Sequence, residues 1–322
     1  MHKKRAVGER LRTELPGLLW LQGVTLLGLG LAGCGGPATQ PVEIRFAAQV
    51  GEVSARCGER YDGVGVLGRP VELADGRLYV SNVALQRADG TRVAVTLDQA
   101  SPWQHGSVAL LDFEDGSGRC AESGTAAMNS TVKGSIPAGD YAGLSFEIGV
   151  PWELDHLDAL TAPSPLNLNA LYWNWRLGYI FTKIEFWNAE LGGPPAETAS
   201  GDLSLQEPAP TVTYLAHIGS TGCESLAPTM PPQQACARPN RAPIVLADFE
   251  PTTDIVVLDL AAMVDGIDIT RSVLRPPGCM ASPSDPDCRQ VFANLGLNLE
   301  TGRCLTDCSD QKLARRRSGT AP

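Results

Sequence analysis

The sequence is poor in charge, in aromatic rings and in histidine. Charged residues make up 19% of its 322 residues and aromatic residues 6%, and only four histidines occur. The formal net charge of −10 at pH 7 argues against nucleic acid as a partner, because phosphate binding needs clustered Lys and Arg. The one basic cluster, Arg315 to Arg317, stands near the C-terminus and is typical of a solvated chain end.

Several motifs of catalysis and cofactor binding are also missing. The sequence has no CxxC pair, no CxxCH haem attachment motif, no phosphate-binding loop and no dinucleotide fingerprint. Gly219 to Gly222 lacks the spacing of a nucleophile elbow. Carboxylates such as Asp112 and Asp155 are plentiful, but nothing selects a glycosidase pair from them. A hydrolase is therefore the weakest functional hypothesis, and we expect that the protein is not an enzyme.

The N-terminal segment has the features of an export signal. Five basic residues between Lys3 and Arg12 precede an apolar run that is short and glycine-rich for a membrane span. The run ends in Leu31-Ala32-Gly33-Cys34, which resembles a bacterial lipobox. We predict a signal peptide over residues 1–33, a lipidated Cys34, a tether over 34–41 and a periplasmic or outer-membrane surface location in the cell envelope. An ordinary secretory signal, cut nearby, is the alternative.

The cysteines support export. Beyond Cys34 eight remain, and an even number in an exported protein indicates disulfides. Proximity along the chain suggests three pairs, with one left over, although it leaves other pairings open: Cys223–Cys236, Cys279–Cys288, Cys304–Cys308 and the remaining Cys57–Cys120. Their spacing is poor for a zinc cluster.

Short apolar stretches bounded by turn residues predict β-strands along most of the chain. With 34 glycines and 24 prolines, the composition favours many turns over long helices. Asp89-Gly90 predicts a tight hairpin turn, and residues 287–296 are a modest helix candidate. The fold class is therefore all-β, an antiparallel sandwich or barrel-like domain over residues 42–295 with long disulfide-stapled loops. We expect residues 296–322 to be a disordered, Cys-containing basic tail. The expected strands are 42–50, 77–86, 92–97, 107–114, 141–150, 179–187, 211–218, 242–249 and 254–260.

Two long loops, 151–170 and 219–241, are the places where function is expected, since sites often lie on long loops of a rigid scaffold. His156 lies in the first loop and His217 directly before the second. Neutral imidazole binds copper and zinc, so this pair is a candidate metal site. Either histidine alone is more typical of a polar loop residue, and only the pair together makes the metal site an equal alternative. His105 fits a turn, and the scattered methionines fit gap-filling.

Tryptophan is concentrated in "NALYWNWRLGYIFTKIEFW", residues 169–187, which holds Trp173, Trp175 and Trp187. Residues two apart on a strand point to the same face, and a pair of large rings commonly fills a sandwich core. Composition alone therefore favours core packing. A structural or carbohydrate-contacting β-sandwich, without metal, is the alternative to a copper protein.

Several stretches together resemble the MbnP-like family of exported copper-binding proteins, found beside methanobactin operons and in other copper-handling gene clusters. The resemblance runs from about residue 42 to about residue 295. The densest stretch is "GDYAGLSFEIGVPWELDHLDALTAPSPLNLNALYWNWRLGYIFTKIEF", and "RFAAQVGEVSARCGERYDGVG", "LYVSNVAL", "VALLDFEDGSGRC", "AHIGSTGC" and "CARPNR" contribute to it.

The resemblance implies a role for the Trp173-Asn174-Trp175 motif. In this family a partner dihaem enzyme of the MauG and cytochrome c peroxidase type oxidises the first Trp of the motif to kynurenine, and the protein then binds one copper ion, as Cu(I). The resemblance thus implies His156, His217 and an oxidised Trp173 as ligands, with Trp175 beside them. It also implies the disulfides Cys57–Cys120 and Cys223–Cys236, because these four match the family's cysteines.

Overall fold

The protein was described from a computed structural model that covers residues 38–188, 190 and 208–319. The predicted signal peptide, Cys34 and residues 34–37 of the predicted tether lie outside the described residues. Within the described part, every helix is too short to cross a membrane.

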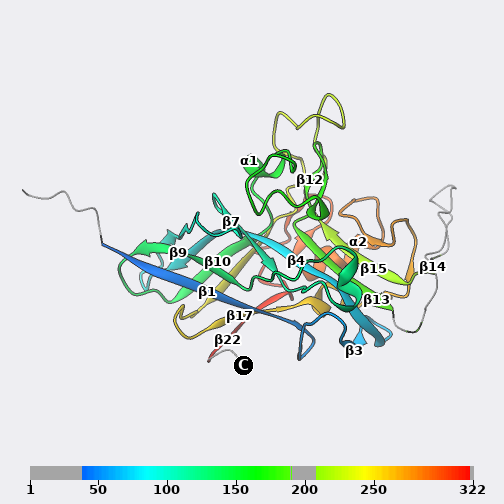
Figure 1. Cartoon of the computed structure of the whole chain (residues 1–322), viewed down its shortest axis with the longest axis horizontal. Helices are drawn as coiled ribbons and strands as arrows, with labels where there is room; N and C mark the ends of the chain where they lie inside the picture. Colours follow the sequence, from blue (N-terminus) through cyan, green and yellow to red (C-terminus); the bar gives the residue numbers. More distant parts are fainter. Residues whose placement is uncertain (1–37, 189, 191–207, 320–322) are drawn as a thin grey trace, which may run out of the picture. The chain divides into compact units, whose positions relative to one another are not determined.

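One sheet has six strands in the order β22-β17-β1-β9-β6, with β2 also paired to β1. Figure 1 shows β1, β17 and β22 side by side. Their bounds are β1 Thr39–Val50, β2 Val53–Ser54, β6 Thr96–Leu97, β9 Thr131–Pro137, β17 Ile255–Asp259 and β22 Ala314–Arg317.

The other sheet has ten strands and is built around the long strand β4, Arg69–Gln86. Its main order is β16-β10-β4-β13-β15-β19, while β3, β5 and β8 also pair with β4 and β7 pairs with β8. The bounds are β3 Arg60–Val64, β5 Arg92–Ala94, β7 Gln104–His105, β8 Val108–Asp112, β10 Gly143–Ile148, β13 Thr182–Asn188, β15 Thr213–Ile218, β16 Ala242–Ala247 and β19 Gly278–Cys279.

The remaining elements are short and lie in the connections. Three two-stranded ladders pair β11 Tyr172–Asn174 with β12 Gly178–Tyr179, β14 Ala209–Pro210 with β18 Arg271–Ser272, and β20 Leu297–Asn298 with β21 Arg303–Cys304. The helices are η1 Gly118–Glu122, α1 Trp152–Asp155, η2 Asn169–Leu171, η4 Leu260–Val264 and α2 Cys288–Asn294. The helix expected over residues 287–296 is α2.

The main hydrophobic core lies between the two sheets. Alternate residues of β1, β4, β10 and β13 point into it, as the two-residue period of a strand requires. Phe46 of β1 meets Phe146 of β10 edge to face, with ring centroids 5.6 Å apart, and burying such a ring contributes about 1.5–3 kcal/mol. The predicted all-β, sandwich-like fold is confirmed.

Strand direction differs in part from the antiparallel prediction. β1 pairs with β17 in parallel, and so does β15 with β19. Parallel neighbours must be joined by a long crossover, and hydrophobic alternation alone carries no information on direction. The predicted hairpin does join β4 to β5. Its Gly90 has a φ of 86°, which favours glycine.

The prediction of a disordered tail is wrong for residues 296–319. β22 pairs with β17 and completes the smaller sheet, and Leu313 and Ala314 are buried in the main core. Arg316 reaches Asp254 at 3.2 Å, so the basic cluster belongs to a strand rather than to a solvated end. Likewise β1 begins at Thr39, within the expected tether.

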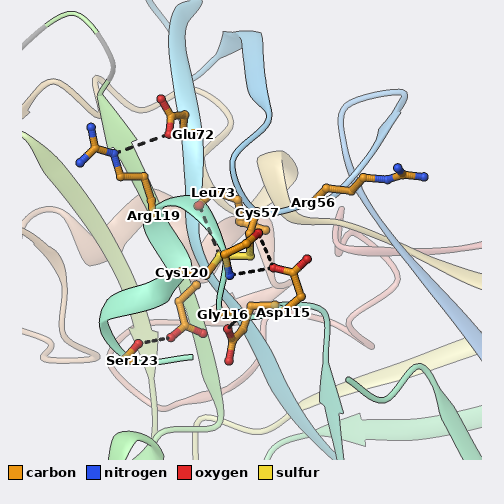
Figure 2. Close-up of a disulfide and its surroundings, with 12 residues drawn as sticks. Arg56, Cys57, Glu72, Leu73, Asp115, Gly116, Arg119, Cys120 and Ser123 are labelled. Atoms are coloured by element: carbon orange, nitrogen blue, oxygen red, sulfur yellow. Dashed lines mark hydrogen bonds and ion pairs between the residues drawn. A yellow bond between two sulfur atoms is a disulfide. The ribbon is translucent and has the colours of Figure 1, made fainter. Parts of the chain in front are cut away.

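Four disulfides join the eight cysteines, in the pairing that proximity along the chain suggests: Cys57–Cys120, Cys223–Cys236, Cys279–Cys288 and Cys304–Cys308. Figure 2 shows Cys57–Cys120, which fastens η1 to the segment between β2 and β3, beside the carbonyl of Leu73 in β4, with Arg119 and Glu72 close by. This bridge spans 63 residues, and closing a loop of that length stabilises a fold by roughly 4 kcal/mol.

Candidate metal centre

The first long loop folds onto the outer face of the larger sheet and encloses a second, smaller core. Tyr79 of β4 and Tyr179 of β12 are both fully buried there. The hydroxyl of Tyr79 donates to the carbonyl of Pro165 at 2.9 Å, and that of Tyr179 donates to Leu166. The loop is therefore held on the sheet by apolar burial and satisfied hydrogen bonds. It begins with α1 and leads into the β11–β12 hairpin, and Figure 1 labels α1 and β12 in this region.

His156 follows α1 directly and is only 9% exposed. Its Nδ1 lies 3.2 Å from the main-chain oxygen of Trp175. Because a carbonyl only accepts, this contact places the proton on Nδ1 and leaves the lone pair on Nε2. Burial lowers the pKa of His156, partly offset by the same hydrogen bond. The imidazole is therefore neutral at pH 7 and has one free donor atom, which is the state that binds a metal.

The WxW segment lies in a small hairpin and not in a strand of the sandwich. Trp173 is in β11, but Trp175 lies in the turn that follows it. The side-chain oxygen of Asn174 accepts hydrogen bonds from the N–H groups of Arg176 and Leu177, each at 3.0 Å, and so closes the turn. The expectation that both tryptophans point to one face of a strand therefore does not apply here.

None of the three tryptophans is a buried core residue. Trp173 and Trp175 are half-buried, and Trp173 packs only at the margin of the main core. A Cβ on Gly219 would come within 2.6 Å of Cζ3 of Trp173, so the ring lies directly against that glycine. Trp187 is half-buried on β13, with the Arg119 guanidinium 3.4 Å from its ring centroid.

His217 lies on β15, two residues before Gly219, and is 8% exposed. Its Nε2 is 2.7 Å from Oε1 of Glu185 on the neighbouring strand β13. Burial raises the pKa of Glu185, but the hydrogen bond from His217, together with the Lys183 ammonium, outweighs it and holds that pKa below its ordinary value. Glu185 is therefore a carboxylate that accepts a hydrogen bond from Nε2.

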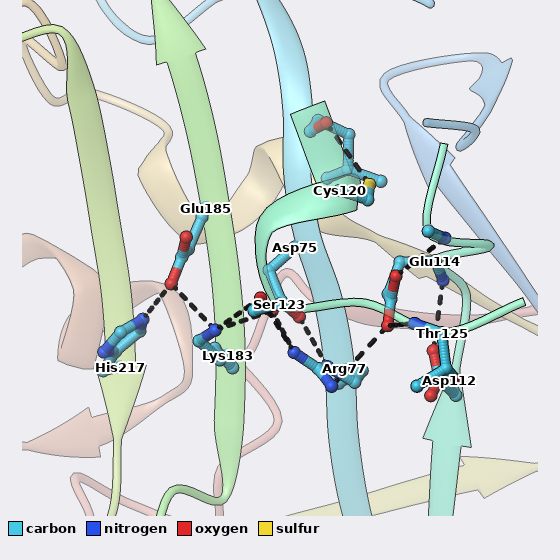
Figure 3. A network of polar contacts seen from close by, with 12 residues as sticks. Asp75, Arg77, Asp112, Glu114, Cys120, Ser123, Thr125, Lys183, Glu185 and His217 are labelled. Carbon is cyan, nitrogen blue, oxygen red and sulfur yellow. Dashed lines mark hydrogen bonds and ion pairs between the residues drawn. The ribbon is translucent and has the colours of Figure 1, made fainter. Parts of the chain in front are cut away.

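A buried charged row continues from His217 across the larger sheet (Figure 3). Lys183 stands opposite His217 in the ladder and donates to Asp75 at 2.8 Å. Asp75 also accepts from Arg77, and Arg77 lies 3.6 Å from Glu114. This charged row was not predicted from the sequence. The only signal for it in the sequence is that polar side chains alternate with apolar ones along β4 and β13.

The two predicted histidine ligands are held in the same way, by a hydrogen bond from one ring nitrogen to an oxygen atom. His156 is held through Nδ1 by a carbonyl, and His217 through Nε2 by a carboxylate. Within residues 38–188, 190 and 208–319, no group hydrogen-bonds Nδ1 of His217. Each ring therefore keeps one nitrogen with a free lone pair, and hydrogen bonding of the other nitrogen is the usual way to orient a metal-binding histidine. Two such imidazoles suit copper or zinc.

The structure joins some of the predicted site residues and not others. Trp175 contacts His156 through its main chain, and Trp173 packs against Gly219, near His217 in the sequence. Among the described residues, His156 and His217 share no hydrogen-bond partner. The ligand roles of His156, His217 and Trp173 thus stay predictions.

Asp155 and the Cys223–Cys236 disulfide complete the surroundings of His156. Asp155 is fully buried and accepts hydrogen bonds from Ser220 at 2.5 Å and from the N–H of Tyr179 at 2.9 Å. Burial raises the pKa of Asp155 to about 7 despite these bonds. Its Oδ2 lies 3.5 Å from His156 Nε2, and Cys236 Sγ lies 3.4 Å from the same nitrogen.

Comparison with known proteins identifies relatives of this chain. The sequence model of the MbnP family matches residues 39–281. Among solved structures, MbnP from Methylosinus trichosporium is similar, with 31% sequence identity and a TM-score of 0.73 over 88% of this chain and 100% of that one. No curated protein matches the chain.

Proposed function

The chain belongs to the MbnP family, and from that premise we propose that it is an exported copper-binding protein of copper homeostasis. It binds one Cu(I) ion and is not itself an enzyme. His156 would hold the ion through Nε2, His217 through Nδ1, and Trp173 after its oxidation to kynurenine. Imidazole is a good ligand for copper, and both rings have a free nitrogen.

The observation that carries this proposal is the contact between His156 Nδ1 and the main-chain oxygen of Trp175, at 3.2 Å. Through this hydrogen bond the WxW segment orients His156, whose other ring nitrogen is free to bind a metal. Modification of Trp173 would therefore take place in a hairpin that already positions a ligand.

Trp173 needs a chemical change to bind a metal, since the indole nitrogen is only a donor of a hydrogen bond. In kynurenine the C2–C3 bond of the indole is broken, C2 has left as formate, and an aryl amine and a ketone remain. Two equivalents of hydrogen peroxide balance the change, which yields kynurenine, formate and water. We assign the electron transfer to a partner dihaem enzyme of the cytochrome c peroxidase and MauG type.

Lipidation at Cys34 would attach the protein to a membrane of the bacterial cell envelope, where disulfides persist. The four disulfides are consistent with such an oxidising compartment.

Peptide mass spectrometry of protein from its native host, with the partner enzyme expressed, tests the maturation. We expect a peptide containing Trp173 in which one carbon has been replaced by one oxygen, while Trp175 is unchanged. A Trp173→Phe variant should lose copper under the same conditions. Unmodified Trp173 in both copper-limited and copper-replete cells would disprove the maturation step.

A further inference from the structure

The Cys223–Cys236 disulfide lies directly beside the free nitrogen of His156. His156 Nε2 and the two sulfur atoms are all within 4.8 Å of one another, and all three residues are buried. The nearest sulfur, Cys236 Sγ, is 3.4 Å from Nε2. Among the described residues, none of the other three disulfides has a histidine in such a group.

We propose that reduction of this disulfide creates a second kind of soft-metal site, in which His156 Nε2 and the thiolates of Cys223 and Cys236 bind Cu(I). The site does not require oxidation of Trp173. It shares His156 with the proposed kynurenine site, so the two would be alternative states of the protein.

The redox step balances with a dithiol as reductant. The dithiol gives two electrons and two protons to the S–S bond, which breaks into two thiols, and the dithiol becomes a disulfide. Cu(I) then replaces the two thiol protons, which go to solvent. The metal does not change its oxidation state.

The distance from His156 Nε2 to the nearest sulfur suits a three-coordinate d10 ion, and the two sulfurs separate when the disulfide is reduced. Bond lengths of about 2.0 Å to imidazole and about 2.3 Å to thiolate place nitrogen and sulfur about 3.7 Å apart in a trigonal site, close to the 3.4 Å found here. Thiolate is the soft ligand that Cu(I) prefers.

The neighbouring groups fit the same role. The hydroxyl of Ser220 lies 3.5 Å from Cys236 Sγ and 3.6 Å from Cys223 Sγ, near enough to orient both sulfurs. Nδ1 of His156 is held by Trp175, so Nε2 stays the donor atom. The site would thus have its outer hydrogen bonds before the metal arrives.

The test uses the full chain with Cys34→Ser, so that no thiol is free before reduction, and Trp173→Phe, so that no kynurenine can form. After anaerobic reduction with a phosphine, we expect one Cu(I) per chain to resist a chromophoric Cu(I) chelator, with sulfur neighbours in X-ray absorption. Adding Cys223→Ser and Cys236→Ser should lower the bound Cu(I) by one equivalent per chain. Undiminished binding after both substitutions, or no binding by the reduced chain, would overturn the proposal.

A single-thiol comparison covers the case in which reduction unfolds the protein. Cys223→Ser frees Cys236 beside His156 while the other disulfides stay intact, and Cys304→Ser is the matched control, since it frees Cys308 away from any histidine in the described part. We expect Cu(I) affinity at least about tenfold higher in the first variant. Adding His156→Gln should remove this difference. Equal affinities would refute the site, whatever the fate of the proposed Trp173 oxidation.

Discussion

The Nδ1 atom of His156 lies 3.2 Å from the main-chain oxygen of Trp175. A side chain at the end of α1 and the turn after β11 are thus joined by one hydrogen bond. It fixes the tautomer of the histidine, so a change in the hairpin changes the histidine as well.

Replacing His156 by Gln should lower copper retention by at least about tenfold, since even outer hydrogen-bonding partners of a ligand are worth about 10–100-fold. Copper per chain after dialysis against a chelator measures it, in protein matured in the native host. His105→Gln is the control, because His105 lies in β7. Retention within twofold of the parent would exclude His156 as a ligand.

Glu185→Gln tests the role of His217. The amide keeps the shape of the carboxylate but loses the negative charge that favours a hydrogen bond from Nε2, so the lone pair of His217 would no longer be fixed on Nδ1. We expect about a 10–100-fold loss of copper affinity, measured by chelator competition. Glu147→Gln is a matched change, since Glu147 also pairs with a cation, Arg241, at 2.8 Å. Unchanged affinity would argue against His217 as a ligand.

Gly219→Ala tests the placement of Trp173. The new methyl group would lie 2.6 Å from the ring and equally close to the main-chain oxygen of Tyr179, so the ring must move. We expect less kynurenine at residue 173 and less bound copper. Gly76→Ala is the control, since its Cβ would meet nothing nearer than 3.4 Å. Normal maturation of the Gly219 variant would show that the ring position is not required.

The sequence predicted the strands better than the details of the site. Strands such as β10 and β17 have alternating or continuous apolar runs, and both were found. By contrast, β22 reads Ala-Arg-Arg-Arg, and only its pairing partner β17 reveals it as a strand. Such pairing is non-local, and no pattern within the segment encodes it.

Within the site, the resemblance to the MbnP-like family and the scarcity of histidine in the chain indicated His156 and His217. The groups that hold them could not be found in this way. Glu185 is one carboxylate among 36 acidic residues, and the partner of His156 is a main-chain oxygen, which every residue has. Both contacts depend on strand register and loop path, which the sequence does not display.

Asp75→Asn should destabilise the larger sheet. Asp75 is fully buried and is the common partner of Arg77 and Lys183. Its neutralisation leaves two buried cations with less compensation, and breaking a buried ion pair costs about 3–5 kcal/mol. Denaturant unfolding measures the loss. Asp62→Asn is the control, as its side chain is 83% exposed, and a loss no larger than that control's would contradict the prediction.

Asp285 should make the free energy of unfolding depend on pH, and this can be measured without any metal. Burial raises the pKa of Asp285 to about 6, although the N–H groups of Met280 and Asp287 donate to it and lower it in part. The folded state therefore keeps a proton between the ordinary pKa of 3.8 and about 6, while the unfolded state has lost it. Because the folded state binds more protons, the free energy of unfolding contributed by this group falls as pH rises through that window and is level above it. Denaturant unfolding between pH 4 and pH 7 should show a steeper decline in the parent than in Asp285→Asn. A variant with the same decline as the parent would exclude Asp285 as its source.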